Sequence, residues 1–300
     1  MKPERCLNRH PMVANWGKTR ADWPGRVCSC LLLLLASGCA SYGEIANKPK
    51  STAATGPTYS LKTWADAKHE GDFTFILAFS GGGTRAAAMA YGVLQELRDT
   101  PIVSDGKQVR LLDEVDHISS VSGGSFTAAY YGLYGDKIFD NFEKEFLRAD
   151  IEKHLVESLF NPFHWFGHKG RTQRTIEYYQ KILFHNATFA DMMQPGRPMI
   201  IINASDLARG VRFSFIQGYF DFLCSDLRSF PVANAVTASS AVPVVFNPVV
   251  VENYASCEGQ ESSFVWPADA AERAKQDPEY AILYDGLQSY TDKTKREYVH

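Results

Sequence analysis

The stretch FTFILAFSGGGTR, residues 73–85, decides how this chain folds. Its first seven residues form a nearly continuous apolar run, which is typical of a strand in a sheet that is covered on both faces. Three glycines follow at once, and residues 84–98 then carry apolar side chains at helical spacing. The stretch is therefore predicted to form a strand, a tight turn and a helix.

The turn in this stretch, Gly81-Gly82-Gly83, can point consecutive N–H groups at one place, and the start of the following helix adds the positive end of its dipole. Such a loop can hold a phosphate or stabilise a developing oxyanion. It lacks the Gly-Lys-Ser/Thr ending of a phosphate-binding P-loop, and it does not follow the GxGxxG pattern of dinucleotide-binding proteins. Taken alone, the triplet also fits a simple tight turn.

A second turn contains Ser122, which lies 39 residues after the glycine triplet in the stretch SVSGGS at residues 120–125. The stretch matches the nucleophile-elbow pattern G-x-S-x-G, with Ser120 in place of the first glycine. Small residues are needed on both sides of the central serine because the strand and the helix approach closely at such a turn. Ser122 is therefore the candidate nucleophile, and Gly123 and Gly124 are expected to support the turn.

Strands and helices continue to alternate along the chain. Short apolar runs predict further strands, and residues 136–185 are predicted to be mostly helical. This alternation predicts parallel β-α-β units and an α/β fold, namely a three-layer α/β/α sandwich with a mainly parallel sheet. Ligands bind such sheets at the carboxyl ends of the strands, where both turns are expected. The further strands are predicted at residues 117–121, 198–203 and 211–215.

The composition of the 300 residues is that of a globular protein, with 45% hydrophobic and 22% charged residues. Residues 1–38 hold six Lys/Arg and two Asp/Glu, which leaves 25 basic and 32 acidic residues in the rest of the chain. A net charge of −7 without a long basic run argues against a nucleic-acid partner.

Residues 1–38 are typical of a bacterial export signal, with a basic start and a ten-residue apolar core at 27–36. The core is too short to span a bilayer, which takes about 20 residues. The sequence Ala36-Ser37-Gly38-Cys39 resembles a lipobox, where a peptidase cuts before a cysteine that carries diacylglycerol. An ordinary secretory signal is the alternative, and translation could also begin at Met12.

This leader predicts a protein of the bacterial cell envelope that is anchored in the membrane by lipid on Cys39. Ala40 at the next position favours the outer membrane. Residues 39–60 are polar and rich in Ser, Thr, Pro and Gly, so they are predicted to be a tether. Residues 61–300 are then expected to form one domain.

Two cysteines, Cys224 and Cys257, lie in this domain, and the expected compartment is oxidising. A disulfide between them is the default expectation, and two buried free thiols are the alternative. Neither these cysteines nor the histidines follow the spacing of a metal site. We therefore expect no metal and no cofactor.

The two turns together resemble those of the patatin-like phospholipase family, in particular its bacterial lipoprotein members. The sequence GGGTRA at residues 81–86 is similar to the family's oxyanion loop, which implies that the three glycine amides form the oxyanion hole and that Arg85 fixes the loop. The sequence ISSVSGGS at residues 118–125 is similar to its elbow, which implies that Ser122 is the nucleophile. Two further segments match family patterns: NASDL at 203–207 and ASSAVP at 238–243.

The resemblance implies a patatin-like fold over roughly residues 73–300 and a serine lipid acyl hydrolase of the phospholipase A or esterase type. Phospholipids or other lipid esters are the implied substrates. The oligomeric state, the head group and the acyl position stay open.

Family members pair the serine with an aspartate, in an Asp-Gly-Gly/Ala motif, which acts as the general base. Asp285-Gly286 is the candidate in this chain, but the second Gly or Ala of the motif is missing. Residues 298–300, Tyr-Val-His, resemble the start of the strand that leads to this motif in the lipoprotein members. We therefore expect the aspartate beyond His300, in a chain that is truncated at its C-terminus, and keep Asp285 as the alternative base.

Two alternative functions remain. Ser122, Asp285 and His300 follow the order of an α/β-hydrolase triad, although a terminal histidine would lie on a fraying end. A non-catalytic envelope lipoprotein could instead bind lipid or a partner, using the aromatic residues between 160 and 166.

Overall fold

The computed structural model divides the chain into residues 1–40 and residues 41–300, and all the residues that it describes belong to the second unit. The described residues are 44–51, 56–67, 74–104, 106–149, 170–242, 246–255, 257, 266–292 and 298–299. The predicted signal peptide, Cys39, the aromatic residues between 160 and 166, and His300 lie outside them.

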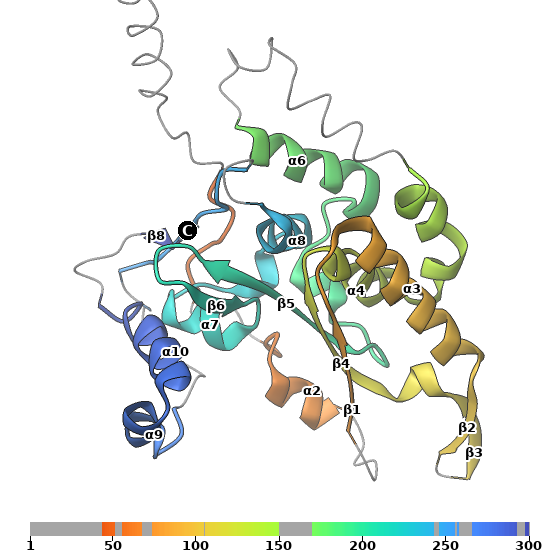
Figure 1. Cartoon of the computed structure of the whole chain (residues 1–300), viewed down its shortest axis with the longest axis horizontal. Helices are drawn as coiled ribbons and strands as arrows, with labels where there is room; N and C mark the ends of the chain where they lie inside the picture. The colour runs from red at the N-terminus through yellow and green to blue at the C-terminus, as the bar shows by residue number, and fades with distance from the viewer. Residues whose placement is uncertain are drawn as a thin grey trace, which may run out of the picture. The chain divides into compact units, whose positions relative to one another are not determined.

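A four-stranded sheet in the order β1-β4-β5-β6 forms the centre of the domain (Figure 1). Strands β1, β4 and β5 are parallel, and β6 is antiparallel to β5. The predicted α/β fold with a mainly parallel sheet is confirmed. The four strands are β1 (Phe75–Phe79), β4 (Val115–Val121), β5 (Met199–Asp206) and β6 (Val211–Ser214).

One face of this sheet is covered by three helices, α3 (Gly83–Asp99), α4 (Gly123–Tyr134) and α8 (Val232–Ser240). Helix α4 packs against β4 and β5, α8 packs against β5, and α3 packs against α4. Gly132 of α4 lies so close to Ile200 of β5 that a Cβ atom would overlap the isoleucine side chain. This close packing holds the second half of α4 against β5.

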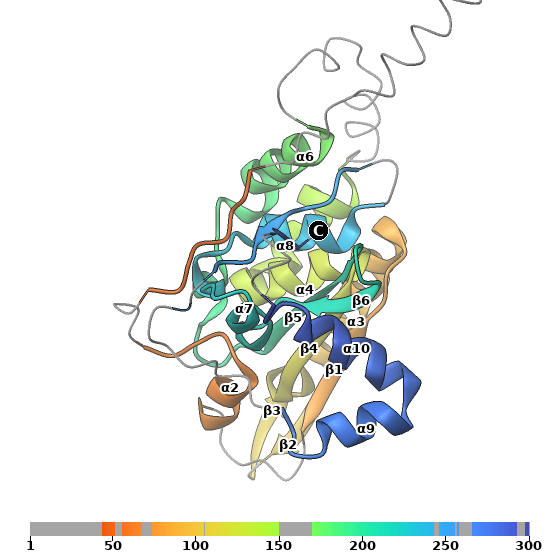
Figure 2. The ribbon, with the colours of Figure 1, turned by 90° about the vertical axis from the view of Figure 1, so that its left-hand side faces the viewer.

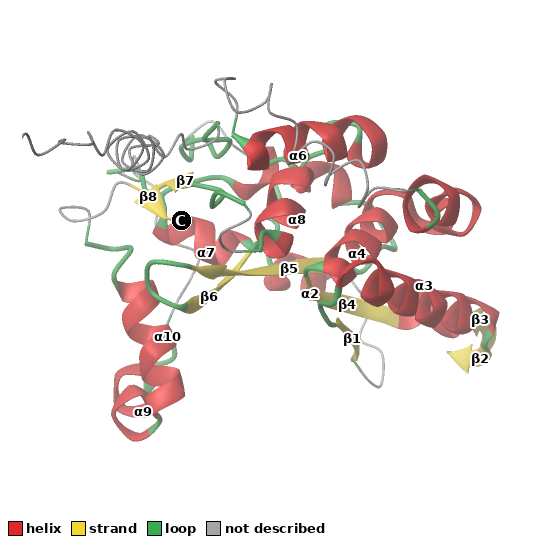
Figure 3. Cartoon of the chain, turned by 45° about the horizontal axis from the view of Figure 1, so that its top comes forward, coloured by secondary structure: helices red, strands yellow, loops and turns green. Residues whose placement is uncertain are grey.

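The opposite face of the sheet is partly open in the described part of the chain. Ile76 of β1 is 59% exposed and Val121 of β4 is 43% exposed, whereas Met199 of β5 is fully buried. Helix α10 (Pro278–Gln288) packs against β6 and α9 (Ala270–Gln276). Figures 2 and 3 show α9 and α10 on the other side of the sheet from α6.

The region predicted to be mostly helical is mostly helical where the structure describes it. Its aromatic side chains pack against Phe126 of α4, whose ring centroid lies 4.6 Å from that of Phe146 in a stacked pair and 4.9 Å from that of Tyr179 in an edge-to-face pair. The elements are η2 (Gly135–Lys137), η3 (Ile138–Leu147), α6 (Arg171–Tyr179), η5 (Gln180–Phe184) and η6 (Phe189–Met192).

Several elements were not predicted from the sequence. A hairpin of β2 (Pro101–Ser104) and β3 (Lys107–Arg110) follows α3, and β7 (Val251–Glu252) is a further short strand. Strand β7 pairs antiparallel with β8 (Tyr298–Val299), which lies where the sequence was expected to begin a strand. The others are α2 (Leu61–Ala67), η1 (Leu111–Glu114), α7 (Gln217–Phe222), η7 (Leu227–Ser229) and the helices α9 and α10. None of the helices described here is long and apolar enough to cross a membrane.

The prediction that residues 39–60 form a tether is wrong for its described parts, 44–51 and 56–60. Asn47 is 3% exposed and Tyr59 is fully buried. The Tyr59 hydroxyl accepts from the Ile200 amide at 3.0 Å and donates to the Ile200 carbonyl at 2.9 Å, at a point of β5 that β6 does not reach. Asn47 and Tyr59 are thus packed into the domain, whereas other residues of these parts, such as Lys48, are exposed. Residues 44–51 are called the strap below.

Candidate functional site

The candidate nucleophile, Ser122, lies between the last residue of β4 and the first residue of α4. Its backbone has φ 51° and ψ −120°, a conformation that a residue with a side chain adopts only under constraint. The residue is half-buried. Such strain at a strand-to-helix turn is the geometry that the elbow pattern predicts.

The two glycines after Ser122 allow the elbow to pack directly onto the glycine loop. A Cβ atom on Gly123 would overlap the Gly83 carbonyl oxygen. A Cβ atom on Gly124 would lie 2.7 Å from the Phe79 Cβ and 2.8 Å from the Ser80 carbonyl oxygen. The two glycines are therefore required because the backbones of two turns approach each other, as the sequence pattern indicates.

The glycine loop and Ser122 lie side by side. A Cβ atom built on Gly81 would lie 3.2 Å from the Ser122 Cβ and 3.8 Å from the Ser122 Oγ. Gly82 has φ 138° and Gly83 has φ 65°, so both adopt conformations that favour glycine. The loop is exposed, and α3 begins at Gly83. Two turns that are separated in the sequence thus meet at one end of the sheet.

A cavity of about 290 Å³ opens beside Ser122. The described residues that line it carry no charged side chain, and its walls are largely aromatic and aliphatic. The lining residues are Gly83, Thr84, Ser122, Gly123, Phe126, Phe146, Thr175, Tyr179, Thr237, Ser240, Ala241, Val242 and Phe246. We call it the serine cavity. An uncharged, apolar wall next to the candidate nucleophile suits a hydrocarbon chain better than a charged group.

A larger cavity of about 590 Å³ lies against β4, β5 and β6. It includes Ser119 and Val121 of β4, Asn203 of β5 and the buried carboxylate of Asp206. The Asp206 carboxylate accepts a hydrogen bond from the Tyr290 hydroxyl at 2.9 Å. Ser122 itself does not line this sheet cavity.

Ser239 connects the elbow to the rest of the domain and was not singled out in the sequence. The Ser122 amide donates a hydrogen bond of 2.8 Å to the Ser239 Oγ, across a separation of 117 residues. The Ser239 hydroxyl donates in turn to the Asn203 carbonyl at 2.6 Å. Ser239 lies in the segment ASSAVP at 238–243, and Asn203 lies in the segment NASDL at 203–207. The match of these two segments to family patterns was the only sign in the sequence that the two residues lie near the site.

The structure does not bring Asp285 to Ser122. Asp285 is exposed in the middle of α10 and lines neither cavity. The adjacent Gly286 packs against Val211 of β6, which holds α10 away from the elbow. The same position argues against the triad of Ser122, Asp285 and His300.

Arg85, which was expected to fix the glycine loop, is exposed in the first turn of α3. Its side chain forms no hydrogen bond or ion pair with any residue that the structure describes. Its proposed role therefore rests on the family resemblance alone.

Buried tyrosines around α4 stay uncharged at neutral pH. Burial, followed by a hydrogen bond to Glu145, raises the pKa of Tyr130 well above its ordinary value. Burial also raises the pKa of Tyr134 to about 12. In the described residues, no group of three or more His, Cys, Asp or Glu is arranged to hold a metal ion.

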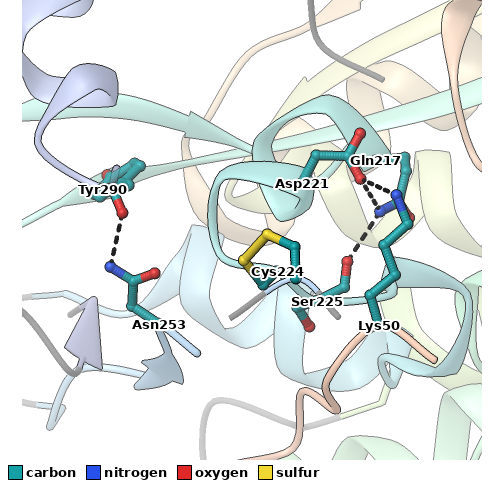
Figure 4. The surroundings of a disulfide bond; sticks show 8 residues. Lys50, Gln217, Asp221, Cys224, Ser225, Asn253 and Tyr290 are labelled. Atoms are coloured by element: carbon teal, nitrogen blue, oxygen red, sulfur yellow. Dashed lines mark hydrogen bonds and ion pairs between the residues drawn. A yellow bond between two sulfur atoms is a disulfide. The ribbon is translucent and has the colours of Figure 1, made fainter. Parts of the chain in front are cut away.

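A disulfide joins Cys224 and Cys257 (Figure 4), away from both cavities. Next to it, the Lys50 ammonium of the strap forms an ion pair of 2.9 Å with the buried Asp221 carboxylate. The Gln217 amide also donates to Asp221, at 2.8 Å. This region contains no candidate catalytic residue, so we assign it to the stability of the domain.

Comparisons with known proteins agree with the α/β fold. The family model described as patatin-like phospholipase matches residues 77–265, which is more than half of the chain. No curated protein matches the chain.

Among solved structures, the chain is similar to human GIVD cytosolic phospholipase A2 in complex with a methyl gamma-linolenyl fluorophosphonate inhibitor and terbium chloride. The sequence identity is 18% and the TM-score is 0.36. The match covers 68% of this chain and 37% of that chain, so it spans little more than a third of the other protein.

Proposed function

The chain belongs to the patatin-like phospholipase family, and from this premise we propose that it is a serine lipid acyl hydrolase with Ser122 as the nucleophile. The observation that carries the proposal is the strained Ser122 backbone packed against the glycine loop, with an uncharged cavity beside it. A serine held in this way at a close strand-to-helix turn is suited to attack a carbonyl carbon.

In the proposed reaction the Ser122 oxygen attacks the ester carbonyl and its proton passes to a general base. The carbonyl oxygen becomes an oxyanion, which the amides of Gly81, Gly82 and Gly83 stabilise. One such donor contributes about 3–4 kcal/mol in known hydrolases. The alcohol then leaves with the proton, and water, activated by the same base, releases the acyl group from Ser122 as a fatty acid.

The base is proposed to be an aspartate, as the family resemblance implies. No carboxylate is among the described residues that line the serine cavity. Asp285 is exposed on α10, so we expect Asp285→Asn to keep full turnover. A loss of turnover in this variant, with unchanged folding, would instead make Asp285 the base.

The proposed substrates are phospholipids or other lipid esters. The aromatic wall formed by Phe126, Phe146 and Tyr179 would contact the acyl chain. Burying methylene groups against this wall stabilises the bound ester by about 0.8 kcal/mol for each CH₂. Turnover should therefore rise with acyl length until the chain fills the cavity.

The test is the release of fatty acid from phosphatidylcholine vesicles and from a series of p-nitrophenyl esters, with the wild-type protein and Ser122→Ala. We expect release by the wild type and none by Ser122→Ala. A fluorophosphonate probe should label Ser122, as located by peptide mass spectrometry. Equal release by both proteins would show that Ser122 is not the nucleophile.

A second candidate function is a lipid- or partner-binding protein without catalysis, which the uncharged serine cavity also favours. The same experiment separates the two. Stable binding to the vesicles without fatty acid release, and without fluorophosphonate labelling, would support the binding protein.

We also propose that lipid on Cys39 anchors the protein in the bacterial cell envelope, in the outer membrane. The support is the lipobox-like sequence alone. Labelled palmitate should be incorporated by the wild type in cells and not by Cys39→Ser. Equal labelling of both would rule out this anchor.

A further inference from the structure

We propose that Ser239, near the end of α8, is a positioning residue that holds the Ser122 backbone in the conformation needed for attack. This inference rests on the proposed function, because it concerns the reactivity of Ser122. Ser239 contacts the backbone amide of Ser122 and not its hydroxyl, so it acts through Ser122.

The Ser239 hydroxyl uses its full hydrogen-bonding capacity at this point. A serine hydroxyl has one donor and two acceptor positions. Its proton goes to the Asn203 carbonyl at 2.6 Å, so its oxygen accepts from the Ser122 amide at 2.8 Å and from the Ser125 hydroxyl at 3.2 Å. One oxygen atom therefore joins α8, the end of β5, the elbow residue Ser122 and the first turn of α4.

Asn203, whose carbonyl accepts the Ser239 proton, is itself held in the sheet by hydrogen bonds of its side chain. The Asn203 side chain donates to the Ser119 hydroxyl at 3.0 Å and to the Ser120 carbonyl at 3.1 Å. Its side-chain oxygen accepts from the Ser214 hydroxyl at 2.8 Å. Asn203 thus connects β4 with β6, and Ser239 extends this connection to the elbow.

Ser122 needs such a connection because its backbone is strained. At φ 51° the residue would relax unless the surrounding groups hold it in place. The glycines restrain the elbow by close approach, whereas the Ser122 N–H donates to the Ser239 side chain. Within the described residues, the Ser239 oxygen is the acceptor of that N–H. Its loss would let the backbone rotate and carry the Ser122 Oγ away from the glycine loop.

The experiment compares Ser239→Ala, Ser239→Thr and a matched control in the full chain. Ser289→Ala is the control, because the Ser289 hydroxyl also donates to a carbonyl at 2.6 Å and is half-buried but lines neither cavity. Threonine keeps the hydroxyl, and the sheet cavity that Ser239 lines gives its methyl group room. The readouts are kcat, KM, the rate of fluorophosphonate labelling of Ser122 and the thermal unfolding midpoint.

We expect Ser239→Ala to lower kcat and the labelling rate on the order of 100-fold, as a misplaced reacting group does, with an unchanged KM. Ser239→Thr should restore both rates, and Ser289→Ala should leave them unchanged. All rates are measured below the unfolding transition and normalised to the folded fraction by circular dichroism. A merely structural role would lower the unfolding midpoint without changing the rates of the folded protein.

Normal kcat and normal labelling of folded Ser239→Ala would overturn the proposal, and so would a failure of threonine to restore the rates. If the wild type releases no fatty acid but its Ser122 reacts with the probe, the hydrolase proposal fails and the labelling rates still decide the role of Ser239. If wild-type Ser122 is inert to the probe as well, both proposals are wrong.

Discussion

The elbow and the strap are both held firmly, but by different physical means. At the elbow, two turns touch backbone to backbone, and Gly123 has no space for a Cβ atom beside Gly83. The strap instead uses side-chain hydrogen bonds: Asn47 donates to the Ser225 hydroxyl at 3.1 Å and to the Glu252 carbonyl at 3.0 Å. A change at the elbow should therefore alter the position of one reactive hydroxyl, whereas a change at the strap should alter stability.

The disulfide next to the strap should show the largest effect on stability. It closes a separation of 33 residues, so its removal in Cys224→Ala/Cys257→Ala should cost about 3–4 kcal/mol. Chemical denaturation of the variant and of the reduced wild type measures the loss. Turnover of the folded protein should not change, because neither cysteine lines a cavity. A parallel loss of turnover would break the distinction between the two regions.

Gly123→Ala tests the elbow directly. The new methyl group would overlap the Gly83 carbonyl oxygen, so the glycine loop must move. We expect turnover to fall by about 100-fold and the free energy of unfolding to fall by about 1–3 kcal/mol. Steady-state kinetics and denaturation provide both values. Turnover at the wild-type level would mean that the glycine loop does not contribute to the reaction.

Asn47→Ala tests the strap without touching the disulfide. The substitution removes the Asn47 side-chain oxygen, which accepts a hydrogen bond of 2.8 Å from the Glu252 backbone amide. It also removes the two hydrogen bonds that the Asn47 side-chain nitrogen donates. We expect a loss of about 1–3 kcal/mol in the free energy of unfolding, with no change in turnover. Lys48→Ala is the control, because the Lys48 side chain is exposed. Equal stability of the two variants would show that the strap is held by its backbone alone.

Gly92→Ala completes the comparison of glycines and should have the smallest effect. Gly92 is exposed inside α3, and a Cβ atom there would have no heavy atom within 4 Å. Alanine should stabilise the helix by about 1 kcal/mol and leave turnover unchanged. A rise in the unfolding midpoint supports this result. A loss of turnover would show that α3 itself is sensitive, so that the effect of Gly123→Ala could not be assigned to the contact with Gly83.

Some elements that the sequence analysis missed did have a local signal. The sequence between β2 and β3 is Asp-Gly, a pair typical of two-residue hairpin turns, and Gly106 has φ 73°. The strap had no such signal. Polar residues with Pro and Gly occur in free tethers and in segments whose side chains bond to a domain, and composition alone does not separate the two.

The sequence by itself determined the four strands of the main sheet, the helix after the glycine turn, the two turns and Ser122 as the candidate nucleophile. These features depend on residues that are close together in the chain: an apolar strand, small residues at the turn, and helical spacing after it. Asp285 shows the limit of this reasoning, because an Asp-Gly pair looks the same at a strand end and inside α10.

Only the tertiary structure decided which groups meet around Ser122. The glycine loop lies about 40 residues before it, and Ser239 follows it at a separation of 117 residues. The register of β1 with β4 brings the two turns to one end of the sheet, and the packing of α8 on β5 places Ser239 under the elbow. Hydrogen bonds and close contacts between such distant residues depend on packing, which no local pattern in the sequence encodes.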